Sequence, residues 1–82
     1  MHFELPINAK VDLHSHIEEE EMYYVLSGRG EVIINDELYI IEPNDLLYIP
    51  KNSQHSLQNN GTEVLILLAI FTSPDVLSNT TS

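Results

Sequence analysis

Apolar and polar residues alternate along most of the chain with a period of two, the spacing of a strand with one buried face. Aromatic and β-branched residues, which favour strands, are frequent in these segments. The longest apolar run, 64–71, is short enough for a strand buried on both faces, although periodicity alone leaves a buried helix open. The pattern predicts about seven short strands, namely 10–16, 22–28, 31–34, 38–41, 45–50, 55–59 and 64–71.

Residues that favour turns separate these segments at short intervals. Asn35-Asp36-Glu37 suits a hairpin, Pro43-Asn44 interrupts the apolar pattern, and Asn60-Gly61 is a strong turn signal. Short strands with this rhythm of turns are typical of a β-sandwich or barrel. We therefore expect an all-β fold in one domain, residues 1–74, with a flexible tail at residues 75–82 that is rich in Ser, Thr and Asn.

Composition narrows the possible functions. The 43% apolar content is too high for a disordered chain despite a net charge of −10. Three basic residues, Lys10, Arg29 and Lys51, stand against thirteen acidic ones, so binding to nucleic acid or to an anionic membrane is not expected. The apolar run is too short to span a membrane. The lack of cysteine and of an evident signal peptide favours a cytoplasmic protein.

Candidate metal ligands gather in one short stretch, HSHIEEEEMYYVLSG at 14–28. On a strand, His14 and His16 lie two apart and share a face. If residues 17–20 reverse the chain, Glu21 begins a second strand and can point toward the same interior, together with Tyr23. The alternative is a solvated acidic turn that happens to carry two surface histidines.

A further histidine, His55, follows Glu21 by 34 residues and begins a segment in which His55, Leu57 and Asn59 share a face. Three imidazoles and one carboxylate suit a divalent transition metal such as Mn, Fe, Ni, Co, Cu or Zn. They suit calcium and magnesium poorly, because those ions prefer oxygen ligands. Spacing alone does not bring His55 to the other three residues.

Two motifs resemble those of the cupin superfamily. In the stretch 14–28, His14, His16, Glu21 and Gly28 match the two histidines, the glutamate and the glycine of the first cupin motif. The stretch NDLLYIPKNSQHSLQN at 44–59 is similar to the second motif, which Pro50, His55 and Asn59 match. The resemblance covers roughly residues 8–71 and implies a small cupin β-barrel of jelly-roll type. It also implies one metal ion held inside the barrel by His14, His16, Glu21 and His55, with Glu20 as the alternative to Glu21.

The chain departs from the cupin pattern at turns and at its N-terminus. Asparagine stands where the family has glycine at Asn44 and Asn52, and in a weaker match at Asn8. Asparagine tolerates a left-handed backbone better than other non-glycine residues, so we expect these turns to form. Only thirteen residues precede His14, fewer than in many small cupins. An exposed sheet edge is therefore expected, and a homodimer would cover it.

Four further residues are candidates for a pocket or for support of the ligands: Tyr23, Tyr48, Leu57 and Asn59. Ordinary core packing is the favoured interpretation for the first three. Asn59 is either a hydrogen-bonding support of the site or simply a residue at a strand end.

The resemblance implies a metal-dependent enzyme that acts on a small oxygen-rich molecule by dioxygenase, isomerase or lyase-type chemistry. The alternative is a non-catalytic cupin that binds or senses a small ligand, with a structural metal or none. Because the chain has few basic residues, a strongly anionic substrate is disfavoured.

Overall fold

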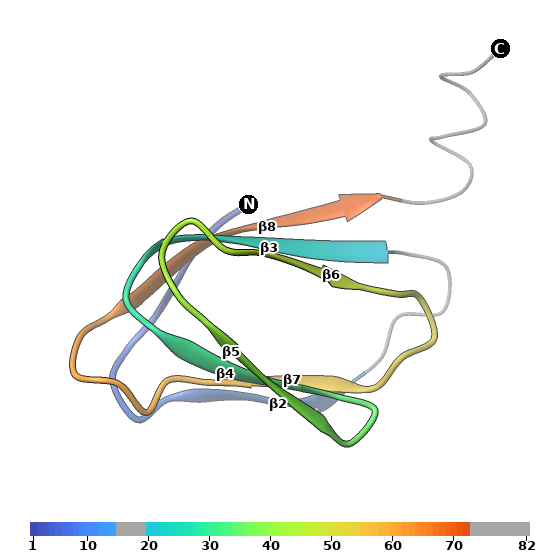
Figure 1. The fold of residues 1–82 in the computed structure, drawn as a ribbon, viewed down its shortest axis with the longest axis horizontal. Helices are drawn as coiled ribbons and strands as arrows, with labels where there is room; N and C mark the ends of the chain where they lie inside the picture. The colour runs from blue at the N-terminus through green and yellow to red at the C-terminus, as the bar shows by residue number, and fades with distance from the viewer. Residues whose placement is uncertain (15–19, 73–82) are drawn as a thin grey trace, which may run out of the picture.

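The computed structural model describes residues 1–14 and 20–72. These residues form strands and turns without a helix, and Figure 1 shows the strands arranged in two layers. The eight strands are β1 (His2–Leu5), β2 (Lys10–His14), β3 (Glu20–Ser27), β4 (Gly30–Ile34), β5 (Glu37–Ile41), β6 (Leu46–Ile49), β7 (His55–Gln58) and β8 (Leu65–Thr72).

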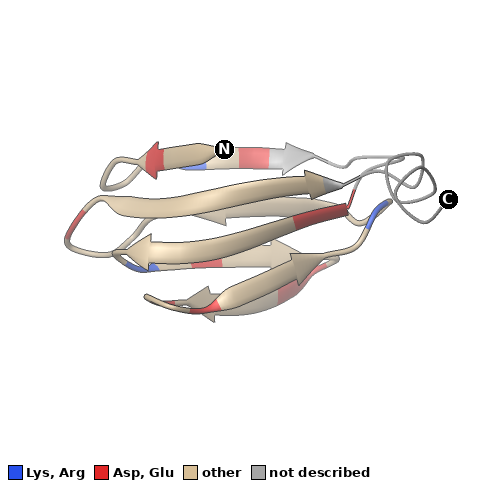
Figure 2. Cartoon of the chain, turned by 90° about the horizontal axis from the view of Figure 1, so that it is seen from above, with Lys and Arg blue, Asp and Glu red and all other residues tan. Residues whose placement is uncertain are grey.

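The strands pair into two antiparallel sheets, in the orders β1-β8-β3-β6 and β2-β7-β4-β5. From above, β8 and β6 carry no charged residue, and red marks only the start of β3, at Glu20 and Glu21 (Figure 2). The two sheets pack face to face as a small barrel or sandwich, and the expectation of an all-β fold is confirmed.

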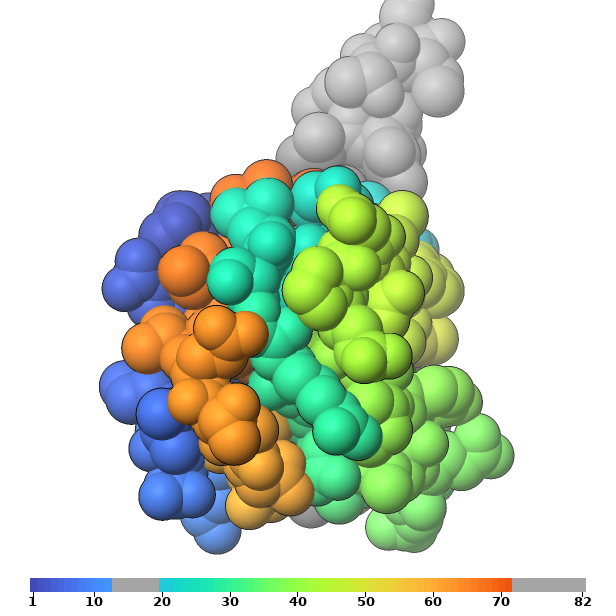
Figure 3. Space-filling view, turned by 60° about the vertical axis from the view of Figure 1, so that its left-hand side comes forward, coloured from blue at the N-terminus to red at the C-terminus, as the bar shows by residue number. Residues whose placement is uncertain are grey.

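The N-terminal segment forms a strand that the sequence pattern did not single out. β1 pairs with β8 in register from His2 opposite Leu68 to Leu5 opposite Leu65, and Figure 3 shows the blue N-terminal residues beside the orange ones. Phe3 is half-buried and Leu5 is buried, as period-two alternation requires. The alternation of apolar and polar residues extends over only four residues here, too few to predict a strand from the sequence.

The core lies between the sheets and is built from alternate residues of each strand. On β3 the inward residues are Glu21, Tyr23 and Val25, as the alternation predicts. The expectation that the apolar run is buried on both faces is wrong, because Ile70 is 40% exposed. The buried hydrophobic residues are Leu5, Tyr23, Val25, Val32, Ile34, Ile41, Ile49, Leu57, Leu65, Leu67 and Ala69.

Several turns use asparagine in the left-handed region, as the sequence predicts. Asn8, Asn44 and Asn52 have φ of 67°, 73° and 65°, so asparagine replaces glycine there at a modest conformational cost. Gly28, the last residue of the first motif, has φ of 84° and lies against the backbone of Leu65. A side chain there would collide with the start of β8.

Within residues 1–14 and 20–72, no helix is long and apolar enough to cross a membrane. The expected domain end at residue 74 and the tail at 75–82 lie outside the described residues.

Candidate functional site

Glu21 enters the interior from β3. It pairs with Ile49 of β6 on one side and with Phe71 of β8 on the other. Because its neighbours Glu20 and Met22 face outward, the alternation of the strand directs Glu21 into the core, where it is 4% exposed. A carboxyl group so far from water requires compensating partners.

The loop after β6 carries the chain from one sheet to the other and delivers His55. Ser53 closes this loop: its hydroxyl donates a hydrogen bond of 2.5 Å to the carbonyl oxygen of Pro50, and its backbone amide contacts the same oxygen at 3.4 Å. Two residues later His55 begins β7 and is 1% exposed. Ser53, itself buried, is a supporting residue that motif matching did not identify.

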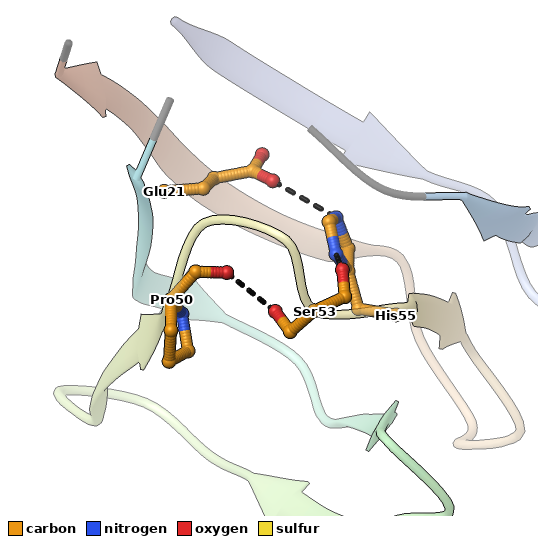
Figure 4. Close-up of polar contacts among 4 residues, drawn as sticks. All are labelled: Glu21, Pro50, Ser53 and His55. Carbon is orange, nitrogen blue, oxygen red and sulfur yellow. Dashed lines mark hydrogen bonds and ion pairs between the residues drawn. The ribbon is translucent and has the colours of Figure 1, made fainter. Parts of the chain in front are cut away.

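Glu21 and His55 meet between the two sheets, although they lie 34 positions apart in the sequence (Figure 4). Oε1 of Glu21 lies 3.1 Å from Nε2 of His55, and Nδ1 of His55 lies 3.3 Å from the carbonyl oxygen of Ser53. A carbonyl oxygen can only accept, so Nδ1 carries a proton in that contact and Nε2 faces the carboxylate. Oε1 of Glu21 and Nε2 of His55 both have lone pairs, so a proton or a cation between them is needed to hold them 3.1 Å apart.

Of the other two predicted ligands, the structure describes only the backbone of His14. His14 lies at the end of β2 directly opposite His55 of β7, after a shift in register that begins at Val11. Irregularities of this kind often occur beside functional sites, where they re-aim a side chain. His16 lies outside the described residues. Among the side chains that the structure describes, no group of three or more potential metal ligands occurs.

Tyr23 and Leu57 line a cavity of about 200 Å³ that includes Glu21. Burial of the Tyr23 phenol, and secondarily the adjacent Glu21 carboxylate, raises its pKa far above the usual value, so the hydroxyl stays protonated at neutral pH. The remaining wall is mainly apolar and comes from β1, β2 and β8, through Phe3, Val11, Leu67, Ala69 and Phe71.

Tyr48 does not pack in the core as expected, because it is 50% exposed on the outer side of β6. Its hydroxyl donates a hydrogen bond of 2.8 Å to Oε2 of Glu20. Tyr48 faces outward because it pairs with the outward Met22 of β3, whereas Ile49 pairs with the inward Glu21.

Asn59 is fully buried and joins three segments. Its Nδ2 donates to the carbonyl oxygens of Leu5 and Glu63, each at 2.9 Å, and its Oδ1 accepts a hydrogen bond of 3.0 Å from the amide of Gly61. At a rise of about 3.3 Å per residue, Asn59 lies about 13 Å along the strand from His55. Asn59 therefore fastens the end of the barrel remote from Glu21 and does not support the candidate ligands.

Sequence comparison identifies the family to which this two-sheet fold belongs. The model of the Cupin domain family matches residues 1–71. The chain therefore belongs to the cupin family.

Similar curated proteins are longer and have diverse names. An uncharacterized protein of Methanocaldococcus jannaschii is 36% identical over 64 residues, 78% of this chain and 51% of that protein. A protein of Thermotoga maritima named oxalate-binding protein is 35% identical over 66 residues, 80% of this chain and 54% of that one. The chain thus spans about half the length of these two relatives.

Solved structures show the same barrel. A predicted oxalate decarboxylase of Thermotoga maritima superposes with a TM-score of 0.84 at 32% identity, covering 88% of this chain and 63% of that one. A cupin protein of Bacteroides fragilis superposes with a TM-score of 0.82 at 28% identity, covering 89% and 63%.

Proposed function

We propose that this cupin domain binds one divalent transition metal ion inside the barrel through His14, His16, Glu21 and His55, and that a small molecule binds at this ion. The contact between Glu21 and His55 is the observation that carries the proposal. It joins the two motifs in space and buries a carboxylate and an imidazole together, a donor pair that suits Mn, Fe, Co, Ni, Cu or Zn.

The distance between the two donor atoms fits a shared ion. Atoms bound to one metal at about 2.1 Å each lie about 3.0 Å apart at a right angle and about 3.4 Å apart at a tetrahedral angle. Oε1 of Glu21 and Nε2 of His55 are separated by 3.1 Å. The Ser53 carbonyl further supports the proposal, because a hydrogen bond to the second ring nitrogen is the usual way to orient a metal-binding histidine.

A bound metal would supply a Lewis acid at the end of the cavity. The residues of this chain would then orient the ligand: Tyr23 offers a protonated hydroxyl beside Glu21, and Leu57 and Ala69 exclude water from the other side. An enzyme acting on a small oxygen-bearing molecule is the leading candidate. A non-catalytic binding or sensing module is the alternative, supported by the small number of polar groups around the cavity.

Elemental analysis of untagged protein purified without added metal tests the site. We expect close to one metal ion per chain in the wild type and at least a tenfold lower content in His16→Ala and His55→Ala. His2→Ala is the matched control, because the His2 side chain is 56% exposed and contacts only the exposed Glu4 among the ion pairs described. Equal metal content in all four proteins would refute the proposal.

Water exchange at the metal tests whether the ion has an open coordination position, as an enzyme requires, or is saturated, as a structural metal is. In protein loaded with Mn²⁺, enhanced relaxation of bulk water protons reports a water molecule in exchange at the ion. A clear enhancement that a small ligand suppresses supports the enzyme, which needs an open coordination position. A saturated ion with no enhancement would reject the enzyme and favour a structural metal.

A further inference from the structure

The cavity beside Glu21 combines an apolar wall with a lack of basic side chains. Two aromatic residues, Phe3 and Phe71, and three aliphatic ones, Val11, Leu67 and Ala69, line it together with Leu57. Among the residues that line it, Glu21 and Tyr23 have polar side chains. Its volume is about 200 Å³, the volume that about seven water molecules occupy in the liquid. This is small for a ligand pocket and near the size needed for one six-membered ring.

All three basic side chains of the protein lie elsewhere. Lys10 points outward and contacts Asp12 at 3.8 Å, with 67% of its side chain exposed. Arg29 and Lys51 are exposed, and residues 15–19 and 73–82 contain no lysine or arginine. Met1 also lines the cavity, and its amino group donates to the carbonyl oxygen of Ala69 at 2.6 Å, beside the β1–β8 pairing.

Charge limits what this cavity can hold. A divalent cation bound by Glu21 retains a single excess positive charge, which one negative charge on a ligand neutralises. A second negative charge would have no lysine or arginine side chain to meet it in a protein of net charge −10, and the one ammonium group nearby, that of Met1, already donates to the carbonyl oxygen of Ala69.

We infer, on the basis of the proposed metal site, that the ligand has one oxygen-bearing head with at most one negative charge and an apolar body the size of a single ring. The head binds at Glu21 and His55, and the apolar body packs on Phe3, Leu67 and Ala69. This class differs from oxalate and from sugar phosphates, which carry more charge and no apolar body.

Three α-hydroxy acids with the same metal-binding head test this ligand class: mandelate carries a phenyl group, glycolate a hydrogen, and tartronate a second carboxylate. Calorimetry on the metal-loaded protein should find mandelate at least tenfold tighter than glycolate, because the phenyl group is transferred from water to the apolar wall. Tartronate should bind no tighter than glycolate. Glycolate or tartronate binding as tightly as mandelate would overturn the inference.

A variant that fills the cavity tests its location. Ala69→Leu should remove most of the preference for mandelate over glycolate while metal content stays that of the wild type, which also shows that the variant is folded. Ile33→Leu is the control, because Ile33 is 41% exposed on the outer side of β4. An unchanged preference in Ala69→Leu would refute binding against this wall.

The ligand class and the metal site can fail separately. Metal-free protein labelled at its methyl groups should show saturable shifts at Ala69 and Leu67 on titration with benzyl alcohol. If these shifts occur but elemental analysis finds that the protein binds no metal, the apolar cavity is retained and the metal site is refuted. Metal binding with no preference for mandelate would retain the metal site and refute the ligand class.

A second inference rests on the outer face of β6, β3 and β8. Their outward residues meet in two rows across the sheet: Tyr48, Met22 and Ile70 in one, and Leu46, Tyr24 and Leu68 in the other. These six residues, named here the outer apolar face, carry no charge, and along the three strands only the start of β3, at Glu20 and Glu21, is charged (Figure 2).

Three members of this face and one adjacent residue already expose about half of the area that each partner buries in a standard interface. Leu46, Tyr48 and Ile70 are 64%, 50% and 40% exposed, and the adjacent Leu26 is 44% exposed. With about 200 Å² as the full area of each such residue, these four expose about 400 Å². That is about half of what each partner buries in a standard interface, before the half-buried members and the rim are counted.

We propose that a second copy of this chain covers the outer apolar face. Two copies with a net charge of −10 each repel one another, so they approach most readily through a surface with few acidic side chains. The outer apolar face has one acidic neighbour on β3, Glu20, whose carboxylate accepts a hydrogen bond from Tyr48. Symmetric pairing places the same face on itself and buries apolar rows against apolar rows. A cationic partner protein would instead be drawn to the acidic surfaces elsewhere.

Sedimentation equilibrium tests the homodimer. The wild type should have twice the 9.3 kDa mass of one chain, and dimerisation should strengthen as NaCl rises because salt screens the repulsion. Leu46→Glu should be monomeric. Leu38→Glu is the matched control, a leucine 57% exposed on edge strand β5 of the other sheet, and should remain dimeric. The milder Leu46→Ser should weaken the dimer. A monomeric wild type, or dissociation by Leu38→Glu alone, would overturn the proposal.

Discussion

Replacement of Asn59 by alanine should strongly destabilise the barrel. The Asn59 side chain makes three hydrogen bonds, to the carbonyl oxygens of Leu5 and Glu63 and from the amide of Gly61. At about 1 kcal/mol of net stability for each, Asn59→Ala should lower the free energy of unfolding by about 3 kcal/mol. A domain of this size has a total of about 4–12 kcal/mol, so the loss is a large fraction of its stability.

Urea unfolding followed by circular dichroism measures this loss. With a slope of about 1–1.5 kcal/mol per molar urea, the unfolding midpoint should fall by about 2–3 M. Asn60→Ala is the control at the adjacent position, because the Asn60 side chain is exposed and, among the contacts described, bonds only the half-buried Glu31 near the surface. The control should change stability by less than about 0.5 kcal/mol. A loss in Asn59→Ala no larger than that would refute the assignment of Asn59 as a fastening residue.

Three further predictions concern the turns and the metal. Gly28→Ala should lower the free energy of unfolding, measured by thermal unfolding, by about 2–4 kcal/mol, because its φ of 84° disfavours a side chain and a Cβ would overlap the Val64 carbonyl. Gly61→Ala is the control and should change this free energy little, because a Cβ there makes ordinary contacts. Asn52→Ala should lose about 1 kcal/mol and Asn52→Gly almost none, because φ is 65° there; equal effects would contradict this reasoning. Metal should be retained at pH 7.5 and released as the pH falls below about 6, because only neutral imidazole binds it. Dialysis followed by elemental analysis tests this, and retention at pH 4 would argue against histidine ligation.

Part of the candidate site was readable from the sequence. Alternation placed Glu21 and Tyr23 on one face of a strand, and both are buried. The same reasoning put His55, Leu57 and Asn59 on one face of another strand, and they too are buried. That His55 faces Glu21 could be expected only from the resemblance to cupins, because no rule of spacing joins residues so far apart in the chain.

The local features of this protein were determined by its sequence alone. The period of two, the left-handed asparagines and the glycine of the first motif depend on interactions within a few residues, and these are the same in any fold that contains them. Strand identity and most turns were therefore predictable. β1 was the exception, because four residues carry too little periodic signal.

The tertiary structure alone decided which faces meet. Pairing with β8 gave β1 its place, the loop closed by Ser53 brought His55 to Glu21, and contacts from Leu5 and Glu63 gave Asn59 its role. The outer side of β8 is apolar in sequence, yet only the assembled sheets show that residues 1–14 and 20–72 leave it partly exposed, with Ile70 at 40%. These features arise from contacts between distant segments, and a local pattern contains no information about which segments become neighbours.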